Sequence, residues 1–130
     1  MHFNKNKLFV EKVDALKIVR KFGTPTYTVD FAKNTRKLIE TNNFGLYNMV
    51  CEGNTSRLEV TKEIINILKL KEKIKINEVE SSFFSKKFFA ERPKSENLIN
   101  SALNKKGLNL MRPWKETLKE YINKYYLDYI

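Results

Sequence analysis

The chain has 130 residues, of which 42% are hydrophobic, so its length and composition suit one modest domain. Lysine and arginine outnumber aspartate and glutamate by 25 to 15, giving a formal net charge of +10. This excess favours acidic partners such as nucleic acid, anionic lipid or a phosphorylated small molecule, without choosing among them. A single cysteine excludes an internal disulfide, and a single histidine, His2, excludes a histidine-based triad or multi-histidine metal site.

The spacing of the glycines and the sequence of the amino-terminal residues exclude further classes of protein. The four glycines lie too far apart to form a dinucleotide-binding or Walker-type phosphate loop: Gly23, Gly45, Gly53 and Gly107. We therefore expect the chain to hold no cofactor of its own and to act by binding. Residues 1–10 lack a secretory leader, and no apolar stretch is long enough to cross a bilayer, so we expect a cytoplasmic protein with no membrane partner.

The first predicted elements are a helix, a strand and a second helix. Apolar periodicity predicts a helix over residues 29–40, with Thr28 as its N-cap, and a short strand over residues 46–50. A capping box of Ser56 and Glu59 then predicts a helix that runs from residue 57 to about residue 69.

In the second half of the chain, the sequence pattern predicts a strand and two helices. Alternating residues predict a half-buried strand at 73–79, and Gly107 closes a short helix over 101–106. Pro113 suits the N1 position of a final helix, which carries a stripe of large apolar side chains. We therefore expect a single α/β domain over residues 1–130: a small mixed lobe of three to four helices with two or three short strands.

The segment 83–94 has two interpretations. Its paired phenylalanines alternate with lysines, as in surfaces that stack bases and neutralise the phosphates of single-stranded nucleic acid. The alternative is a loop whose phenylalanines pack against the edge of the domain while the lysines are solvated.

Arg92 also has two interpretations. The residue before a proline is extended, so the Arg92 guanidinium could bind a diphosphate through two hydrogen bonds, or it could pair with a neighbouring glutamate. Cys51 is expected to be a small buried apolar residue.

A series of motifs in a fixed order resembles the carboxy-terminal, substrate-side part of dTDP-4-dehydrorhamnose reductases, which are extended short-chain dehydrogenases. The resemblance covers about residues 22–125. The segments that carry it are Phe22-Gly-Thr-Pro-Thr-Tyr-Thr-Val-Asp-Phe-Ala32, Phe44-Gly-Leu-Tyr-Asn-Met-Val-Cys-Glu-Gly53, Ser56-Arg57, Ala90-Glu-Arg-Pro-Lys94 and Arg112-Pro-Trp-Lys-Glu-Thr-Leu-Lys-Glu-Tyr121.

The resemblance implies a lobe that closes over a sugar nucleotide in dTDP-L-rhamnose biosynthesis and lacks the Rossmann half. It implies substrate-binding roles for four residues: Arg92 and Pro93 in the Arg-Pro loop, and Thr24 and Thr26 in the Gly-x-Pro-Thr turn. A full-length relative would use NAD(P)H. No tyrosine here is followed four positions later by lysine, so the resemblance implies no catalytic residue and no hydride transfer by this chain alone.

Two features depart from this pattern. Arg20-Lys21 stands where the family has Asp-Gln, and residues 8–27 are also similar to the amino-terminal segment of diaminopimelate decarboxylases. We therefore expect residues 1–21 to be a divergent segment of a truncated or rearranged reductase. Its expected partners are a dTDP-sugar and a Rossmann-containing chain or a second copy of itself. The alternative function is a basic module that binds single-stranded nucleic acid.

Overall fold

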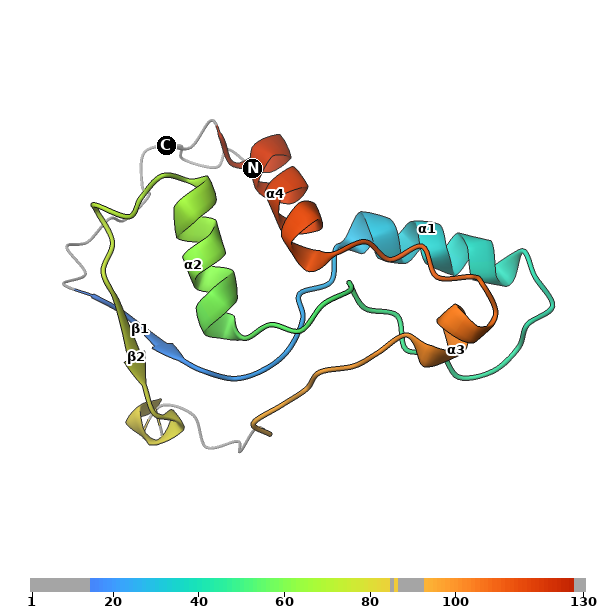
Figure 1. Ribbon diagram of the computed structural model, residues 1–130, viewed down its shortest axis with the longest axis horizontal. Helices are drawn as coiled ribbons and strands as arrows, with labels where there is room; N and C mark the ends of the chain where they lie inside the picture. Colours follow the sequence, from blue (N-terminus) through green and yellow to red (C-terminus); the bar gives the residue numbers. More distant parts are fainter. Residues whose placement is uncertain (1–14, 85, 87–92, 128–130) are drawn as a thin grey trace, which may run out of the picture.

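The computed structural model describes residues 15–84, 86 and 93–127, which form four α-helices and two short strands (Figure 1). Several expected elements lie within these residues, and the expected fold class, a small α/β lobe, is confirmed. The elements in chain order are β1 (Leu16–Val19), α1 (Thr28–Ile39), α2 (Arg57–Ile67), β2 (Ile76–Val79), a 3₁₀ turn (Ser81–Phe84), α3 (Ser101–Lys105) and α4 (Trp114–Tyr125).

The two strands form a parallel pair in which Leu16 lies opposite Ile76 and Val19 opposite Val79. Parallel strands require a crossover connection, and here it contains both α1 and α2. Arg20, just after β1, donates to both carboxylate oxygens of Glu78 on β2, at 2.7 and 3.1 Å, and to Glu59 on α2 at 3.1 Å. The position where the family has Asp-Gln therefore holds an arginine that links both strands to α2.

Helix α2 begins where the sequence predicts it. The Ser56 hydroxyl accepts a hydrogen bond from the Glu59 main-chain N–H at 3.4 Å, and it also contacts the Glu59 carboxylate. Leu58 and Ile65 are buried on the inner face, and the helix packs against α4 and β1. The helix ends at Ile67, two residues before the expected end.

The hydrophobic core lies between the start of α1 and the start of α4. Four buried side chains form it: Tyr27, Cys51, Met111 and Trp114. Partly buried residues from α1, α2, α4 and the segment before Cys51 pack around this cluster: Val29, Met49, Val60 and Leu118. Cys51 is 1% exposed, which confirms its expected place in the core.

Three expectations about local structure were wrong. Residues 46–50 form no strand, because no main-chain group of a described residue pairs with their main chain, whereas β1 is a strand that the sequence pattern did not predict. Thr28 is the first residue of α1, and Tyr27 takes the N-cap position. Pro113 is the N-cap of α4 and not its first residue.

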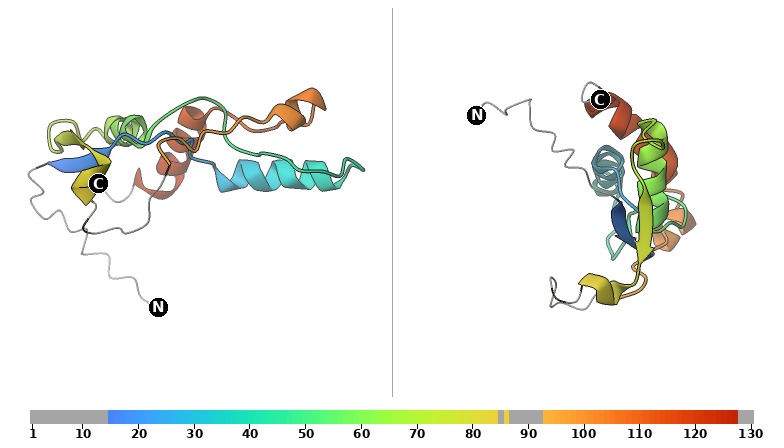
Figure 2. Two further views of the ribbon diagram at one scale, coloured as in Figure 1. Left: turned by 90° about the horizontal axis from the view of Figure 1, so that it is seen from below. Right: turned by 90° about the vertical axis from the view of Figure 1, so that its left-hand side faces the viewer.

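The molecule is elongated, with α1 and α3 at one end and α2 and the strands at the other (Figure 2). We refer to α1, the residues 40–50 that follow it and α3 together as the arm. Helix α3 ends at Lys105 and is closed by Gly107 two residues later, as predicted; the φ of +64° there favours glycine. Among the described residues, no helix is long and apolar enough to span a membrane.

Candidate functional site

Three segments that are far apart in the sequence meet at Phe22 and Gly23. The Phe22 main chain donates to the Lys94 carbonyl at 3.0 Å and accepts from the Glu96 N–H at 2.9 Å. On the other side, the Gly23 N–H donates to the Thr55 carbonyl at 3.1 Å. The Gly-Thr-Pro-Thr turn therefore lies beside the residues that follow Pro93 and beside the residues that precede α2. We call this meeting point the junction.

The Glu52-Gly53 turn fixes the position of Trp114 at the junction. The Thr24 hydroxyl donates to the Gly53 carbonyl at 2.7 Å, and the Trp114 N–H donates to the Glu52 carbonyl at 3.0 Å. Gly53 has a φ of +98°, and a Cβ atom there would lie 3.2 Å from Cδ1 of the Trp114 ring. Both its conformation and this close approach require glycine.

A cavity of about 320 Å³ lies between the Gly-Thr-Pro-Thr turn and α4. Thr26 is on its wall, together with aromatic rings and hydroxyl groups from both elements. The lining residues are Pro25, Thr26, Tyr27, Thr28, Trp114, Thr117, Leu118 and Tyr121. Its size and its mixture of aromatic and hydroxyl groups suit a small organic ligand.

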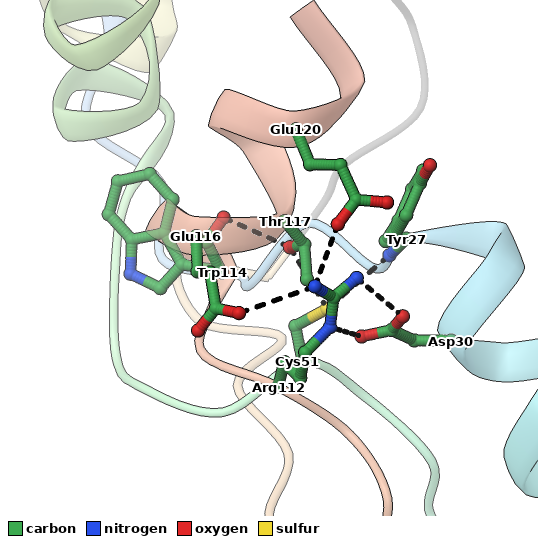
Figure 3. A network of polar contacts seen from close by, with 8 residues as sticks. All are labelled: Tyr27, Asp30, Cys51, Arg112, Trp114, Glu116, Thr117 and Glu120. Atoms are coloured by element: carbon green, nitrogen blue, oxygen red, sulfur yellow. Dashed lines mark hydrogen bonds and ion pairs between the residues drawn. The ribbon is translucent and has the colours of Figure 1, made fainter. Parts of the chain in front are cut away.

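Next to this cavity, Arg112 connects α1 to α4 through a network of ion pairs (Figure 3). Its guanidinium binds both carboxylate oxygens of Asp30 on α1, at 2.9 and 2.8 Å. It also donates to Glu120 at 2.7 Å and to Glu116 at 3.2 Å, both on α4. Asp30 is 2% exposed, so its burial depends on this partner. Arg112 thus fixes α1 relative to α4.

The same network shifts the pKa values of the residues that form it. Hydrogen bonding to Arg112 lowers the pKa of the Asp30 carboxyl and, in the same way, that of Glu120. The two carboxylates in turn raise the pKa of the Arg112 guanidinium. Burial, together with the charge of Glu120, raises the pKa of the Tyr27 hydroxyl. All four groups therefore keep their ordinary charge near neutral pH.

The residues expected to bind substrate have different surroundings. Thr24 uses its hydroxyl for the bond to Gly53, whereas Thr26 lines the cavity. Pro93 is exposed, directly before the segment that bonds to Phe22. Arg92 lies outside the described residues, as do Phe88, Phe89 and the rest of 87–92. The structure thus brings the Pro93 side of the loop and the Thr24 turn to one place.

The sequence motifs gave no role to Asp30 or to the Arg112 side chain. Arg112 was noted only as part of the Arg-Pro-Trp motif, and the two residues are 82 positions apart. Glu52 was missed as well: Asn100 and Asn109 donate to its carboxylate at 3.0 and 2.6 Å. Across the described part of the chain, no group of three or more histidine, cysteine or acidic residues could hold a metal ion.

The family of the chain follows from comparison with known proteins. The family model described as RmlD substrate binding domain matches residues 5–127, nearly the whole chain. The chain belongs to this family. The match begins well before residue 22, where the motif series starts, so the RmlD substrate-binding domain includes most of the segment expected to diverge.

Three solved structures with this fold are dTDP-4-dehydrorhamnose reductases. The enzyme from Clostridium acetobutylicum is 31% identical over 85% of this chain, with a TM-score of 0.75. The enzyme from Bacillus anthracis, solved in complex with NADP, is 25% identical over 86% of the chain, with a TM-score of 0.71. The Yersinia enterocolitica enzyme shares the fold, with a TM-score of 0.74 at 23% identity.

The present chain corresponds to a minor part of these relatives. It spans 39% of the Clostridium acetobutylicum and Bacillus anthracis chains and 38% of the Yersinia enterocolitica chain. No curated protein matches it. The match therefore concerns the substrate-binding domain, which is a minor part of each of these relatives.

Proposed function

We propose that this chain is the substrate-side lobe of a dTDP-4-dehydrorhamnose reductase-like protein and that it binds a dTDP-sugar. The observation that carries the proposal is the family match over residues 5–127. The geometry of the junction supports it, because the Gly-Thr-Pro-Thr turn and the segment after the Arg-Pro pair lie side by side there. Two motifs from distant parts of the sequence thus contribute to one site.

The proposed contacts follow from the chemistry of a nucleoside diphosphate sugar. Arg92 binds the diphosphate, because its planar guanidinium can donate two parallel hydrogen bonds to phosphate oxygens. Pro93 restricts the conformation of that loop. Thr26 and the aromatic rings beside it contact a ring of the ligand, and Thr24 holds the turn in place through Gly53.

Reduction of the sugar requires a further part of the protein. The sequence has no glycine-rich cofactor loop and no Tyr-x-x-x-Lys pair, so we propose that NAD(P)H binds to a Rossmann-containing part outside these residues. The Bacillus anthracis relative was solved with NADP. We expect the lobe to position the dTDP-sugar in the cytoplasm without transferring the hydride itself.

Calorimetric titration of the purified chain with dTDP-L-rhamnose tests this proposal. Arg92→Ala should weaken binding at least about tenfold, and Arg92→Lys should recover only part of it, since lysine lacks the bidentate fork. Lys71→Ala is the matched control, because it removes a positive charge beside α2, away from the junction. Equal affinity in all four proteins, or no binding by any, would contradict the proposal.

Nucleic-acid binding is the alternative that the family match does not favour. The part of segment 83–94 that the structure describes includes an edge-to-face contact of Phe83 with Phe84 and Lys17 above the Phe83 ring at 4.4 Å. Titration with a single-stranded oligonucleotide at several salt concentrations distinguishes the two. Affinity that falls steeply with salt, together with no response to dTDP-L-rhamnose, would reverse the choice.

A further inference from the structure

Phe22 exposes an aromatic ring at the centre of the junction. Its main chain is held on one side by hydrogen bonds to Lys94 and Glu96, and on the other side it forms an antiparallel bridge with Ser56. The side chain is nevertheless 42% exposed. The main chain of Phe22 is therefore fixed by two segments while its ring remains open to solvent.

The Phe22 ring forms no aromatic or cation–π contact with a described residue of the chain. The ring pairs among the described residues involve other side chains, and the lysines placed above rings lie over Phe83, Trp114 and Tyr125. A single exposed apolar side chain is ordinary on a protein surface. Phe22 differs because its main chain is rigidly positioned beside two motifs assigned to the ligand.

Positively charged residues lie on both sides of Phe22. Lys94 is bonded to Phe22 through its carbonyl, and Arg57 follows Ser56 on the opposite side. Both side chains are exposed, and neither forms an ion pair with a described residue. Arg92 precedes Lys94 by two residues, which limits the separation of their Cα atoms to at most about 8 Å. An aromatic ring and several cations thus share one small region.

We propose that the Phe22 ring stacks on the thymine base of the dTDP-sugar. This inference rests on the proposed function and assigns the residue that holds the base. Aromatic side chains bind bases through their π faces, and cations beside them neutralise the attached phosphates. One ribose separates the base from the diphosphate, so the ring and the cations must lie within a nucleotide's length of each other, as Phe22 and Lys94 do.

The base suits Phe22 better than the sugar does. The cavity that contains Thr26 offers hydroxyl groups as well as rings, which suits a sugar that carries several hydroxyl groups of its own. The Phe22 side chain offers only an aromatic face, which suits a planar base. The two places therefore bind different ends of the same ligand.

Calorimetric titration of the full chain with dTDP and with dTDP-L-rhamnose tests the inference, because the two ligands share the base and differ in the sugar. Phe22→Leu keeps an apolar side chain but removes the ring, so it should weaken both ligands by the same factor, at least about fivefold. Phe22→Tyr should bind both ligands as the wild-type chain does. Phe31→Leu is the matched control, because Phe31 is 45% exposed on α1.

Proton NMR of dTDP during the titration gives a readout that a purely structural role of Phe22 would not change. Protons above an aromatic face are shielded, so the thymine methyl resonance should move upfield on binding to the wild-type chain and to Phe22→Tyr. It should not move upfield with Phe22→Leu. If Phe22→Leu does not fold, the upfield shift with the wild-type chain decides the matter.

The outcomes separate this inference from the proposed function. If the wild-type chain binds neither ligand, both fail. If the wild-type chain binds both ligands, three results overturn the inference alone: unchanged affinity in Phe22→Leu, a loss of affinity confined to dTDP-L-rhamnose, or a thymine methyl resonance that does not move with the wild-type chain.

Discussion

At the junction, main-chain hydrogen bonds join Phe22 and Gly23 to two distant segments, whereas residues 44–50 of the arm form no main-chain hydrogen bond to another described residue. The junction is next to the core, where Trp114 is 5% exposed, and the arm holds Leu46 at 94% exposed. The first region satisfies its own polar groups and buries its own apolar groups. Residues 44–46 of the arm do neither, so we expect the stability of the chain to depend on the junction and on the buried side of α1, and its association to depend on these exposed residues.

The largest expected effect is that of Trp114→Ala. The ring is buried with Tyr27, Cys51 and Met111, so its loss should lower the free energy of unfolding by about 3–5 kcal/mol. Phe44→Ala removes an aromatic ring from the arm and should change it by less than about 0.5 kcal/mol. Urea denaturation followed by circular dichroism measures both, and similar losses in the two variants would remove the contrast between the regions.

Asp30→Asn should have the next largest effect. It keeps the volume of the side chain but breaks the buried pair with Arg112, which should cost about 1–3 kcal/mol. The pKa of Asp30 is lower in the folded protein than in the unfolded chain, so its contribution is present above the unfolded pKa and is lost as the pH falls through the folded pKa.

The acid sensitivity of the variant provides an independent check. Wild-type protein should lose stability below about pH 4, and Asp30→Asn should lose less over the same range because one of the shifted carboxyls is gone. Melting temperatures between pH 7 and pH 3 measure this difference. Parallel pH curves would mean that Asp30 does not contribute through its ion pair.

Gly53→Ala tests the close approach at the junction. Residue 53 has a φ of +98°, and the added Cβ atom would lie 3.2 Å from the Trp114 ring, so the substitution should lower the free energy of unfolding by about 1–3 kcal/mol. Gly23→Ala is the matched control, since Gly23 has no positive φ and the nearest side-chain atom would lie 3.9 Å away. The midpoint of thermal unfolding should fall clearly for the first variant and little for the second, and the reverse order would contradict the geometry described for the turn.

The smallest effect on stability should come from changing the exposed side chains of Phe44 and Leu46. Replacing Phe44 and Leu46 together by serine should alter the free energy of unfolding by less than about 0.5 kcal/mol, because both side chains are already exposed. The same double variant should reduce self-association and aggregation at high concentration. Light scattering measures the association, and a large loss of stability would show that these two side chains pack against the domain.

The helices could be predicted because their signals are local. The Ser56 cap, Gly107 and the apolar stripe of α4 each lie within a few residues of the element they define. Strands depend on a partner elsewhere in the chain. Leu16 pairs with Ile76, and a four-residue strand carries too little pattern to be recognised alone. Residues 46–50 show the opposite case, in which the pattern is present but no strand of the described residues pairs with it.

Prediction of the candidate site had the same limit. The resemblance supplied Thr24, Thr26 and the Arg-Pro loop, because these belong to short motifs. Asp30 and Arg112 lie 82 positions apart, and nothing in one sequence pairs a particular arginine with a particular carboxylate. Arg20 illustrates this limit: it departs from the family motif, and its partners Glu59 and Glu78 became known only from the fold.

The most direct test of the central claim, that the lobe binds a sugar nucleotide, is a thermal melt of the purified chain with a large excess of dTDP-L-rhamnose. A ligand at about 100 times its dissociation constant adds about 2.7 kcal/mol, which raises the midpoint by several degrees for a domain of this size. We predict a single cooperative transition that moves upward with the ligand and less so in Arg92→Ala. A cooperative transition that does not move with ligand would contradict the account.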